Sequence, residues 1–220
     1  MTEERIPFHI PMKLNDNDIE TIKLRIEYSF DTGQISNGVY VKQLEEKIRK
    51  MYDVDYCIAT SNCTMGLFIC YLYYGYLGPL HLQNFTWKSV DIITHKFFKV
   101  FHDIDINTWL MSEIPHYGIV SPTHTFGNIC EIDKKYDREK IIFDGAHTLG
   151  AKIDYIGDAT VFSLAPTKLI TSCEGGMIIT NDKGLYEYAS ETRHIIARMS
   201  EPNAMIGLAT IKRASTKGSK

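Results

Sequence analysis

Short apolar runs that alternate with helix-forming segments constrain the fold of this chain more than any other feature of its sequence. The runs are rich in β-branched and aromatic residues and are bounded by turn residues, which is typical of strands in a buried sheet. In chain order they read YCIAT, LHLQ, FFKVFHD, YGIVSP, KIIFD, ATVFSL and GGMIIT. The pattern predicts an α/β protein with a mostly parallel central sheet and helices on both faces.

Helical periodicity marks the segments around these strands. Residues 15–30 begin with capping residues and carry isoleucines at helical spacing. Residues 41–52 carry an apolar stripe with oppositely charged pairs four residues apart. Further helices are predicted from Met65 onward, over 86–96 and over 183–196.

Composition and charge exclude several classes of function. A chain of 220 residues with 44% hydrophobic and 23% charged residues is long enough to bury one sizeable core. Its net charge of -3 and pI near 6.2 give no reason to expect nucleic acid or an anionic membrane as partner. The five cysteines form no CxxC pair, so we expect reduced cytoplasmic thiols, no disulfide frame and no metal site. The polar N-terminal sequence MTEERIPFHIPMKLND does not predict a signal peptide.

The uncharged segment 65–82 raises one alternative, a membrane-spanning helix. Its length is about the lower limit for crossing the hydrocarbon core. It contains Gly75, Gly78, Pro79 and four tyrosines, and a polar turn precedes it. We therefore interpret it as a buried helix that leads into a turn and a strand, and expect no membrane partner.

Polar residues follow three of the predicted strands at their carboxyl ends, where open α/β sheets bind ligands. Residues 61–64 follow YCIAT, Asp144 ends KIIFD, and Ser163 lies near the end of ATVFSL. The first loop offers hydroxyls and backbone amides at a helix N-terminus, which suits a phosphate, although a capped helix alone is the simpler interpretation. No GxGxxG follows the first strand, so a dinucleotide is not expected.

Lys168 lies in a loop of small residues just beyond ATVFSL. A phosphate-binding loop, an aromatic ring, a carboxylate and a lysine are together what pyridoxal phosphate requires. The lysine can hold the aldehyde as a Schiff base, and the carboxylate can keep the pyridine nitrogen protonated, so that the ring acts as an electron sink. Spacing alone leaves open that Asp144 and Lys168 are solvated surface residues.

Three motifs decide between these interpretations. DGAHTLGA, GDATVFSLAPTK and CEGG occur in this order and resemble the DegT/DnrJ/StrS family of sugar aminotransferases, which are fold-type-I enzymes that use pyridoxal phosphate. Other family-like blocks extend the resemblance from the N-terminus to about Thr180, and a later one resembles the family's YRMSELQAALGLAQL helix. These blocks are residues 6–14, 32–67, 84–90, 101–108, 121–133 and 197–213.

The resemblance assigns a role to each residue of the expected cofactor site. Lys168 is the catalytic residue, which holds the cofactor covalently and carries protons. Asp144 pairs with the pyridinium nitrogen, and His147 contacts the phenolate oxygen of the ring, although a buried histidine bonded to backbone is an alternative for it. Trp87 stacks on the ring, although an isolated tryptophan is more often a core residue.

The same resemblance assigns the phosphate to Thr64 and the backbone amide of Met65, with a hydroxyl from Ser163. One departure concerns Ile196, which stands where the family has an asparagine that the neighbouring subunit donates to the phosphate. In the family each subunit of a homodimer completes the other's site, so we expect a homodimer here.

A second departure concerns length. The chain stops at Lys220, where the family continues into a C-terminal small domain. We expect a single pyridoxal-phosphate-binding large domain over residues 1–220, with an N-terminal helical arm over about 1–50. The chain is then a trimmed member, a split enzyme or a fragment, and the apolar helix MIGLATI (205–211) is expected to lack part of its cover.

The reaction that the resemblance implies is a two-stage transamination in polysaccharide biosynthesis. An amino acid, commonly L-glutamate, gives its amino group to the cofactor, which passes it to a nucleotide-linked keto-deoxy sugar. A dehydratase-type relative is disfavoured because it carries histidine in place of Lys168. A catalytically degraded cofactor-binding or assembly partner of a full-length paralogue remains an alternative, followed by a purely structural scaffold.

Overall fold

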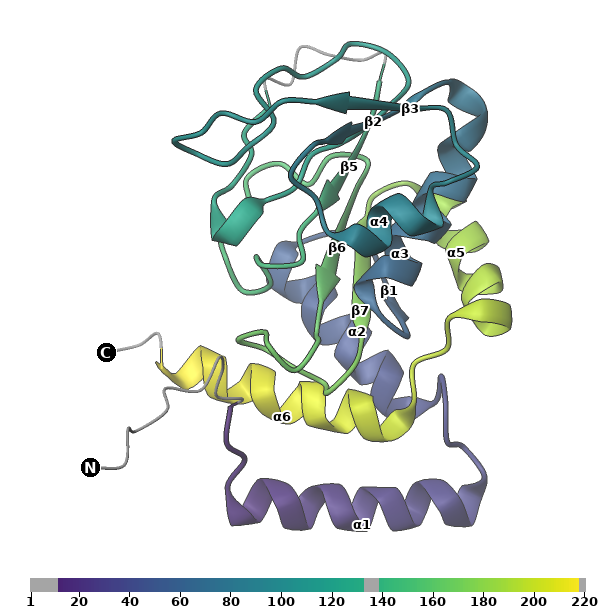
Figure 1. Cartoon of the computed structure of the whole chain (residues 1–220). Helices are drawn as coiled ribbons and strands as arrows, with labels where there is room; N and C mark the ends of the chain where they lie inside the picture. Colours follow the sequence, from purple (N-terminus) through teal and green to yellow (C-terminus); the bar gives the residue numbers. More distant parts are fainter. Residues whose placement is uncertain (1–11, 133–138, 218–220) are drawn as a thin grey trace, which may run out of the picture.

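The computed structural model describes residues 12–132 and 139–217 (Figure 1). The polar N-terminal stretch and the family-like block at 6–14 lie largely outside this part of the chain, as does the beginning of the expected arm. Every predicted strand is present. The strands are β1 (Tyr56–Thr60), β2 (Leu80–Gln83), β3 (Lys99–His102), β4 (Ile119–Ser121), β5 (Lys140–Asp144), β6 (Ala159–Ser163) and β7 (Gly176–Thr180).

The strands form one sheet in the order β1-β7-β6-β5-β4-β2-β3. β7 runs antiparallel to both of its neighbours, β1 and β6. The other neighbouring pairs are parallel, so the predicted mostly parallel sheet is confirmed. Because β7 lies inverted between them, β1 and β6 point the same way, and the carboxyl ends of β1, β5 and β6 share one edge.

The predicted helices are also present, with differences at their ends. They are α1 (Asp16–Thr32), α2 (Val39–Tyr52), α3 (Cys63–Tyr74), α4 (Lys88–Ile93), α5 (Lys183–Ile196) and α6 (Glu201–Lys217), with short 3-10 turns η1 (Gly75–Leu77) and η2 (Thr125–Gly127). α3 begins before Met65 because the Asn62 side chain caps it, accepting the Met65 N–H at 2.9 Å. α4 is shorter than predicted and ends at Ile93, and the hydroxyl of the next residue, Thr94, donates back to the Val90 carbonyl at 2.7 Å.

Helices lie on both faces of the sheet (Figure 1), and each face buries a hydrophobic core. α3 and α5 pack on one face, with Leu67, Ile142 and Leu185 fully or almost fully buried. α2 and α6 cover the other face over β1, β7 and β6. Over β4 and β5 this second face is covered by the long connections between strands, which bring Met111 and Cys130 onto the sheet.

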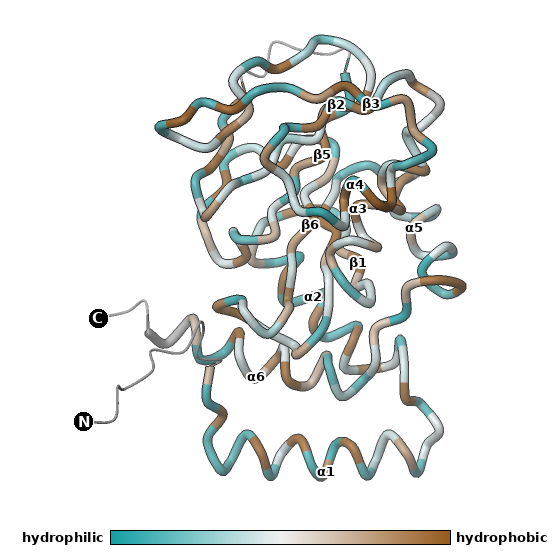
Figure 2. The backbone as a smooth tube through the Cα atoms, in the orientation of Figure 1, coloured by the Kyte–Doolittle hydropathy of each residue, from teal (hydrophilic) through white to brown (hydrophobic). Residues whose placement is uncertain are grey.

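The helix that carries MIGLATI is well covered, contrary to expectation. Met205 and Ile211 of α6 are fully buried, because α6 packs against α2 and α1. Figure 1 shows α1 lying alongside α6 at one end of the molecule. α1 itself exposes apolar side chains, among them Leu24 and Phe30, and its trace in Figure 2 alternates between hydrophobic and hydrophilic residues.

The segment 65–82 divides into most of α3, the turn η1 and the start of β2, as the sequence predicted. Within residues 12–132 and 139–217, no helix is both long and apolar enough to span a bilayer. The membrane-spanning alternative for this segment is therefore wrong.

Candidate active site

The shared carboxyl edge of β1, β5 and β6 gathers the residues that the sequence singled out. Asp144 ends β5, Ser163 ends β6, and residues 61–64 connect β1 to α3. β7 begins at the same edge with Gly176, which pairs with Thr60 on one side and Ser163 on the other. A side chain at Gly176 would lie 2.4 Å from the backbone of Asn62, so this glycine lets the loop before α3 pack directly on β7.

Asp144 is a buried carboxylate with few partners. It is 5% exposed, and its Oδ1 accepts the Ala146 N–H at 3.0 Å. Burial raises the pKa of Asp144 to about 6, while the Ala146 hydrogen bond and the charge of Lys168 oppose this increase. The carboxylate is therefore poorly solvated, and a cation placed beside it would interact with it strongly.

Lys168 lies beyond β6 in a turn, where its backbone N–H donates to the Ala165 carbonyl at 3.0 Å. The side chain is half-buried, and burial lowers the pKa of its amine, while Cys63 and Asp144 counteract that decrease. Lys168 lines a cavity of about 320 Å³ together with His147, Ser163 and Phe126. Asp144 is not among the lining residues and borders the cavity through Ala146.

His147 follows β5 in the turn that begins at Asp144. Its imidazole is exposed and lies nearly parallel to the Phe126 ring, with centroids 6.0 Å apart and an interplanar angle of 23°. The alternative of a buried, backbone-bonded histidine is therefore wrong. Partial burial and the charge of Lys168 lower the pKa of His147, so it is neutral near pH 7.

The expected phosphate site lies at the first turn of α3. The Thr64 hydroxyl lies 2.7 Å from the hydroxyl of Ser89, which sequence reasoning missed. The Met65 amide is already used by the Asn62 cap, so a phosphate would compete with that side chain for it. The Ser163 hydroxyl accepts the Ala165 N–H at 3.3 Å and lines the cavity.

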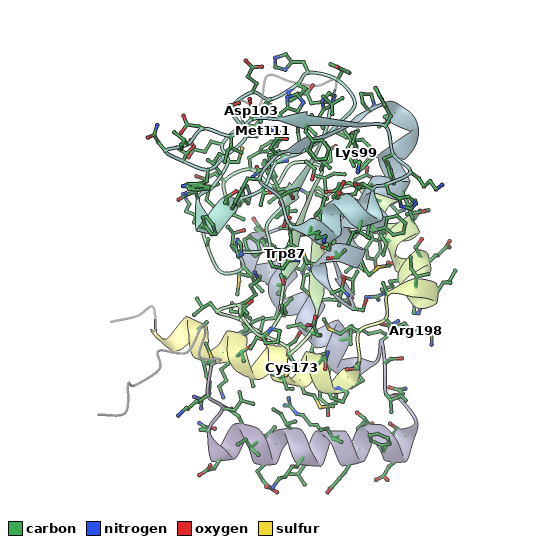
Figure 3. All side chains as sticks on the ribbon, viewed as in Figure 1. Trp87, Lys99, Asp103, Met111, Cys173 and Arg198 are labelled. Atoms are coloured by element: carbon green, nitrogen blue, oxygen red, sulfur yellow. The ribbon has the colours of Figure 1, made fainter. Side chains whose placement is uncertain are left out.

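Trp87 is not among the residues that line the cavity. It precedes α4 and is 77% exposed, so the core alternative for this tryptophan is wrong. Figure 3 labels it near the centre of the view. The stacking role of Trp87 stays a prediction.

Comparison with known proteins identifies the family of this chain. A model of the DegT/DnrJ/EryC1/StrS aminotransferase family matches residues 16–217. The chain belongs to this family. The motifs of the sequence had indicated the same family, and that prediction is confirmed.

One curated member of the aminotransferase family is dTDP-4-amino-4,6-dideoxy-D-glucose transaminase of Shigella dysenteriae. It is 28% identical over 214 residues. The match covers 82% of this chain and 58% of the relative. The chain spans about half the length of the curated relatives it matches.

Solved structures of the family share the fold. DesI, solved with its TDP-sugar product, superposes with a TM-score of 0.80 at 24% identity, covering 94% of this chain and 60% of DesI. An E. coli GDP-4-keto-6-deoxy-D-mannose-3-dehydratase with bound hydrated PLP gives a TM-score of 0.78 at 15% identity, covering 96% and 68%. The predicted fold class, that of the large domain of fold-type-I enzymes, is confirmed.

An aromatic cluster lies beside the cavity, and sequence reasoning did not predict this cluster. Phe85, Trp109 and Phe126 lie in mutual contact, with ring centroids 5.0 to 5.9 Å apart. Trp109 and Phe126 have left-handed backbone conformations, with φ of 63° and 55°. Non-glycine residues adopt such values at a cost, and they cluster at functional sites. The three residues come from different loops, so no local pattern indicates their contact.

A larger cavity of about 690 Å³ lies at the β2–β3 edge and is lined by several imidazoles and carboxylates, including His81, His102 and Glu113. Within the described ranges, no group of three or more His, Cys, Asp or Glu side chains is arranged to hold a metal ion. The smaller cavity is the candidate site, because the Lys168 amine lines it and the buried Asp144 carboxylate adjoins it through Ala146.

Proposed function

We propose that this chain is a pyridoxal-phosphate-dependent aminotransferase that moves an amino group from L-glutamate to a nucleotide-linked keto-deoxy sugar. The observation that carries the proposal is that Lys168 lines a cavity beside the buried carboxylate of Asp144, which is hydrogen-bonded to the lining residue Ala146, and that each group perturbs the ionisation of the other. Membership of an aminotransferase family supports the reaction class. The names of relatives, which include a dTDP-sugar transaminase and a GDP-perosamine synthase, support the substrate class.

The residues present fit this cofactor. A buried carboxylate with a raised pKa suits a protonated ring nitrogen, which would restore its full negative charge. The paired hydroxyls of Thr64 and Ser89 and the Ser163 hydroxyl at the cavity are the donors that would hold the cofactor's phosphate. When bound, pyridoxal phosphate supplies an electron sink and a temporary carrier for the amino group.

The chain's own residues then have separate tasks. Asp144 would pair with the ring nitrogen and keep it protonated, and His147 would contact the oxygen substituent of the ring. Lys168 would hold the cofactor by its aldehyde and, as a neutral amine, would carry protons during the amino transfer. Burial favours that neutral amine, because it lowers the pKa of Lys168.

Assembly and location belong to the same proposal. We infer a homodimer, because Phe85, Phe126 and Leu169 expose apolar surface at the cavity or next to it, and patches of this kind recruit partners. A cytoplasmic location is consistent with the free thiols of all five cysteines. The single-domain assignment for residues 1–220 is also a proposal.

A second candidate function has one observation in its favour. Ile196, which ends α5, is a partly exposed apolar residue at the position where the sequence resemblance expects a phosphate-binding asparagine. The candidate is a cofactor-binding partner of a full-length paralogue that does not turn over sugars.

Reductive trapping tests the proposal. Protein incubated with pyridoxal phosphate and reduced with borohydride is expected to carry the cofactor on Lys168 in a peptide map. Lys168→Ala is expected to lose the adduct, and Lys152→Ala is the matched control because Lys152 is exposed and pairs only with Asp154 among the described residues. An adduct on another lysine, or none, would contradict the assignment.

Turnover separates the two candidate functions. The aminotransferase is expected to convert glutamate to 2-oxoglutarate in a half-reaction and then to aminate a nucleotide-linked keto sugar. A protein that traps the cofactor on Lys168 but performs neither step favours the partner function.

A further inference from the structure

Cys63 is the first residue of α3 and is buried behind Asp144. Its side chain is 8% exposed. The Sγ lies 3.6 Å from the Val161 carbonyl oxygen and 4.0 Å from Asp144 Oδ1. Asp144 and Val161 are register partners on β5 and β6. The thiol therefore lies over two adjoining strand ends, at the carboxylate that the proposed function assigns to the cofactor ring.

The thiol acts toward this carboxylate as a donor, and it shares its one S–H group between Asp144 Oδ1 and the nearer Val161 carbonyl. Burial raises the pKa of Cys63 well above its ordinary value, and the charge of Asp144 raises it further, whereas Lys168 lowers it. The sulfur therefore keeps its proton near pH 7. An S–H group is a weak donor, but burial of both groups removes most of the water that would compete with it.

The other ionisable groups around Asp144 make different contacts. Lys168 acts on it through its charge. The Tyr71 hydroxyl, also close enough to interact electrostatically, is paired with Ser121 Oγ at 2.6 Å. Among the described residues, Cys63 is thus the one side chain in hydrogen-bond contact with the Asp144 carboxylate, a long contact that it shares with the Val161 carbonyl, and Ala146 supplies a backbone hydrogen bond.

We propose that Cys63 is a positioning residue, whose thiol holds Asp144 Oδ1 together with the Ala146 N–H so that Oδ2 is left for the cofactor's ring nitrogen. The proposal rests on the proposed function for the role of Oδ2, whereas the contact itself exists without cofactor. Two donors on one oxygen fix the rotation of the carboxylate plane. Replacing the thiol by a methyl group frees that rotation and removes a donor that stabilises the charged form.

Infrared spectroscopy of the cofactor-free protein tests the contact directly, because S–H stretching bands lie apart from other protein absorption and shift with hydrogen bonding. The Cys63 band is assigned by its loss in Cys63→Ala. It is expected to shift as Asp144 titrates around pH 6, and Asp144→Asn is expected to abolish that shift. The control is the band of Cys173, an exposed thiol, which is assigned by its loss in Cys173→Ser. That band is expected to stay in place during the titration of Asp144 and in Asp144→Asn.

The titration midpoint of Asp144, followed by its carboxyl bands, separates positioning from simple packing. Cys63→Ala is expected to raise the midpoint by about half a pH unit, because one donor to the charged form is lost. Cys63→Ser is expected to restore or lower it, because a hydroxyl is the stronger donor. A Cys63 band that is independent of pH, or equal midpoints in all three proteins, would overturn the proposal. If the band follows Asp144 but the protein binds no pyridoxal phosphate, the contact stands and the proposed function fails.

Discussion

Replacing Glu201 by alanine is expected to destabilise the protein by about 3 kcal/mol, because three charge-assisted hydrogen bonds to backbone amides are lost together. Glu201 begins α6 and is fully buried. Its carboxylate accepts the N–H groups of Gly38 at 2.9 Å, Tyr40 at 2.8 Å and Val41 at 3.1 Å. These amides form the N-terminus of α2, where no residue of α2 itself supplies a side-chain cap.

The magnitude follows from the geometry of this contact. A hydrogen bond to a charged group contributes about 1.5 to 3 kcal/mol, and three that share one carboxylate do not add fully. The negative charge also stabilises the positive end of the α2 dipole. Glu201→Gln keeps one oxygen acceptor but can place an NH₂ opposite a backbone N–H, so we expect a loss of about 1 to 2 kcal/mol.

Urea unfolding of the cofactor-free protein measures these differences, with the slope of the transition checked for constancy. Glu20→Ala is the control, because Glu20 is an exposed residue whose pair with Lys23 is worth about 0.5 kcal/mol or less. A loss below about 1 kcal/mol for Glu201→Ala, or equal losses for the alanine and glutamine variants, would refute the reasoning.

Three further predictions concern the strand ends. Asp144→Asn is expected to retain covalent capture of pyridoxal phosphate but to lose transamination by orders of magnitude, and near-normal turnover in a half-reaction assay would assign Asp144 another task. Because the pKa of Asp144 rises from 3.8 to about 6 on folding, the cofactor-free protein is expected to lose about 2 to 3 kcal/mol of stability between about pH 4 and pH 6. Asp144→Asn is expected to remove that loss, so urea midpoints of the two proteins diverge as the pH rises; parallel pH profiles would argue against a raised pKa. Gly176→Ala is expected to cost about 2 kcal/mol or more and to weaken cofactor binding, since its Cβ would clash with Asn62; unchanged stability and affinity would contradict this.

The elements of the fold were predictable because hydrophobic periodicity specifies them locally. Each apolar run became a strand, and the helical stripes became α1, α2 and α5 at nearly the expected bounds. The loop cover over β4 and β5 was not predictable, since Met111 and Cys130 reach the sheet from irregular segments with no period.

Residues of the candidate site that lie at or just beyond the end of a strand could be predicted from the sequence. Asp144, Ser163 and Lys168 follow from strand boundaries and motifs. Contacts between segments distant in sequence, such as Cys63 with Asp144, leave no local pattern. The same holds for the left-handed backbone of Phe126, because no glycine marks that conformation there.

The inverted strand β7 also affects the order in which this protein can fold. β1 has only β7 as its neighbour in the sheet, and Thr60 pairs with Gly176, far later in the chain. Pairs with such wide separation form slowly, because closure of the intervening loop costs entropy before any contact is gained. On a ribosome, which makes the N-terminal part first, β1 must wait until β7 emerges. The loop that follows β1 packs on Gly176, so a nascent chain acquires its expected phosphate site among its last features.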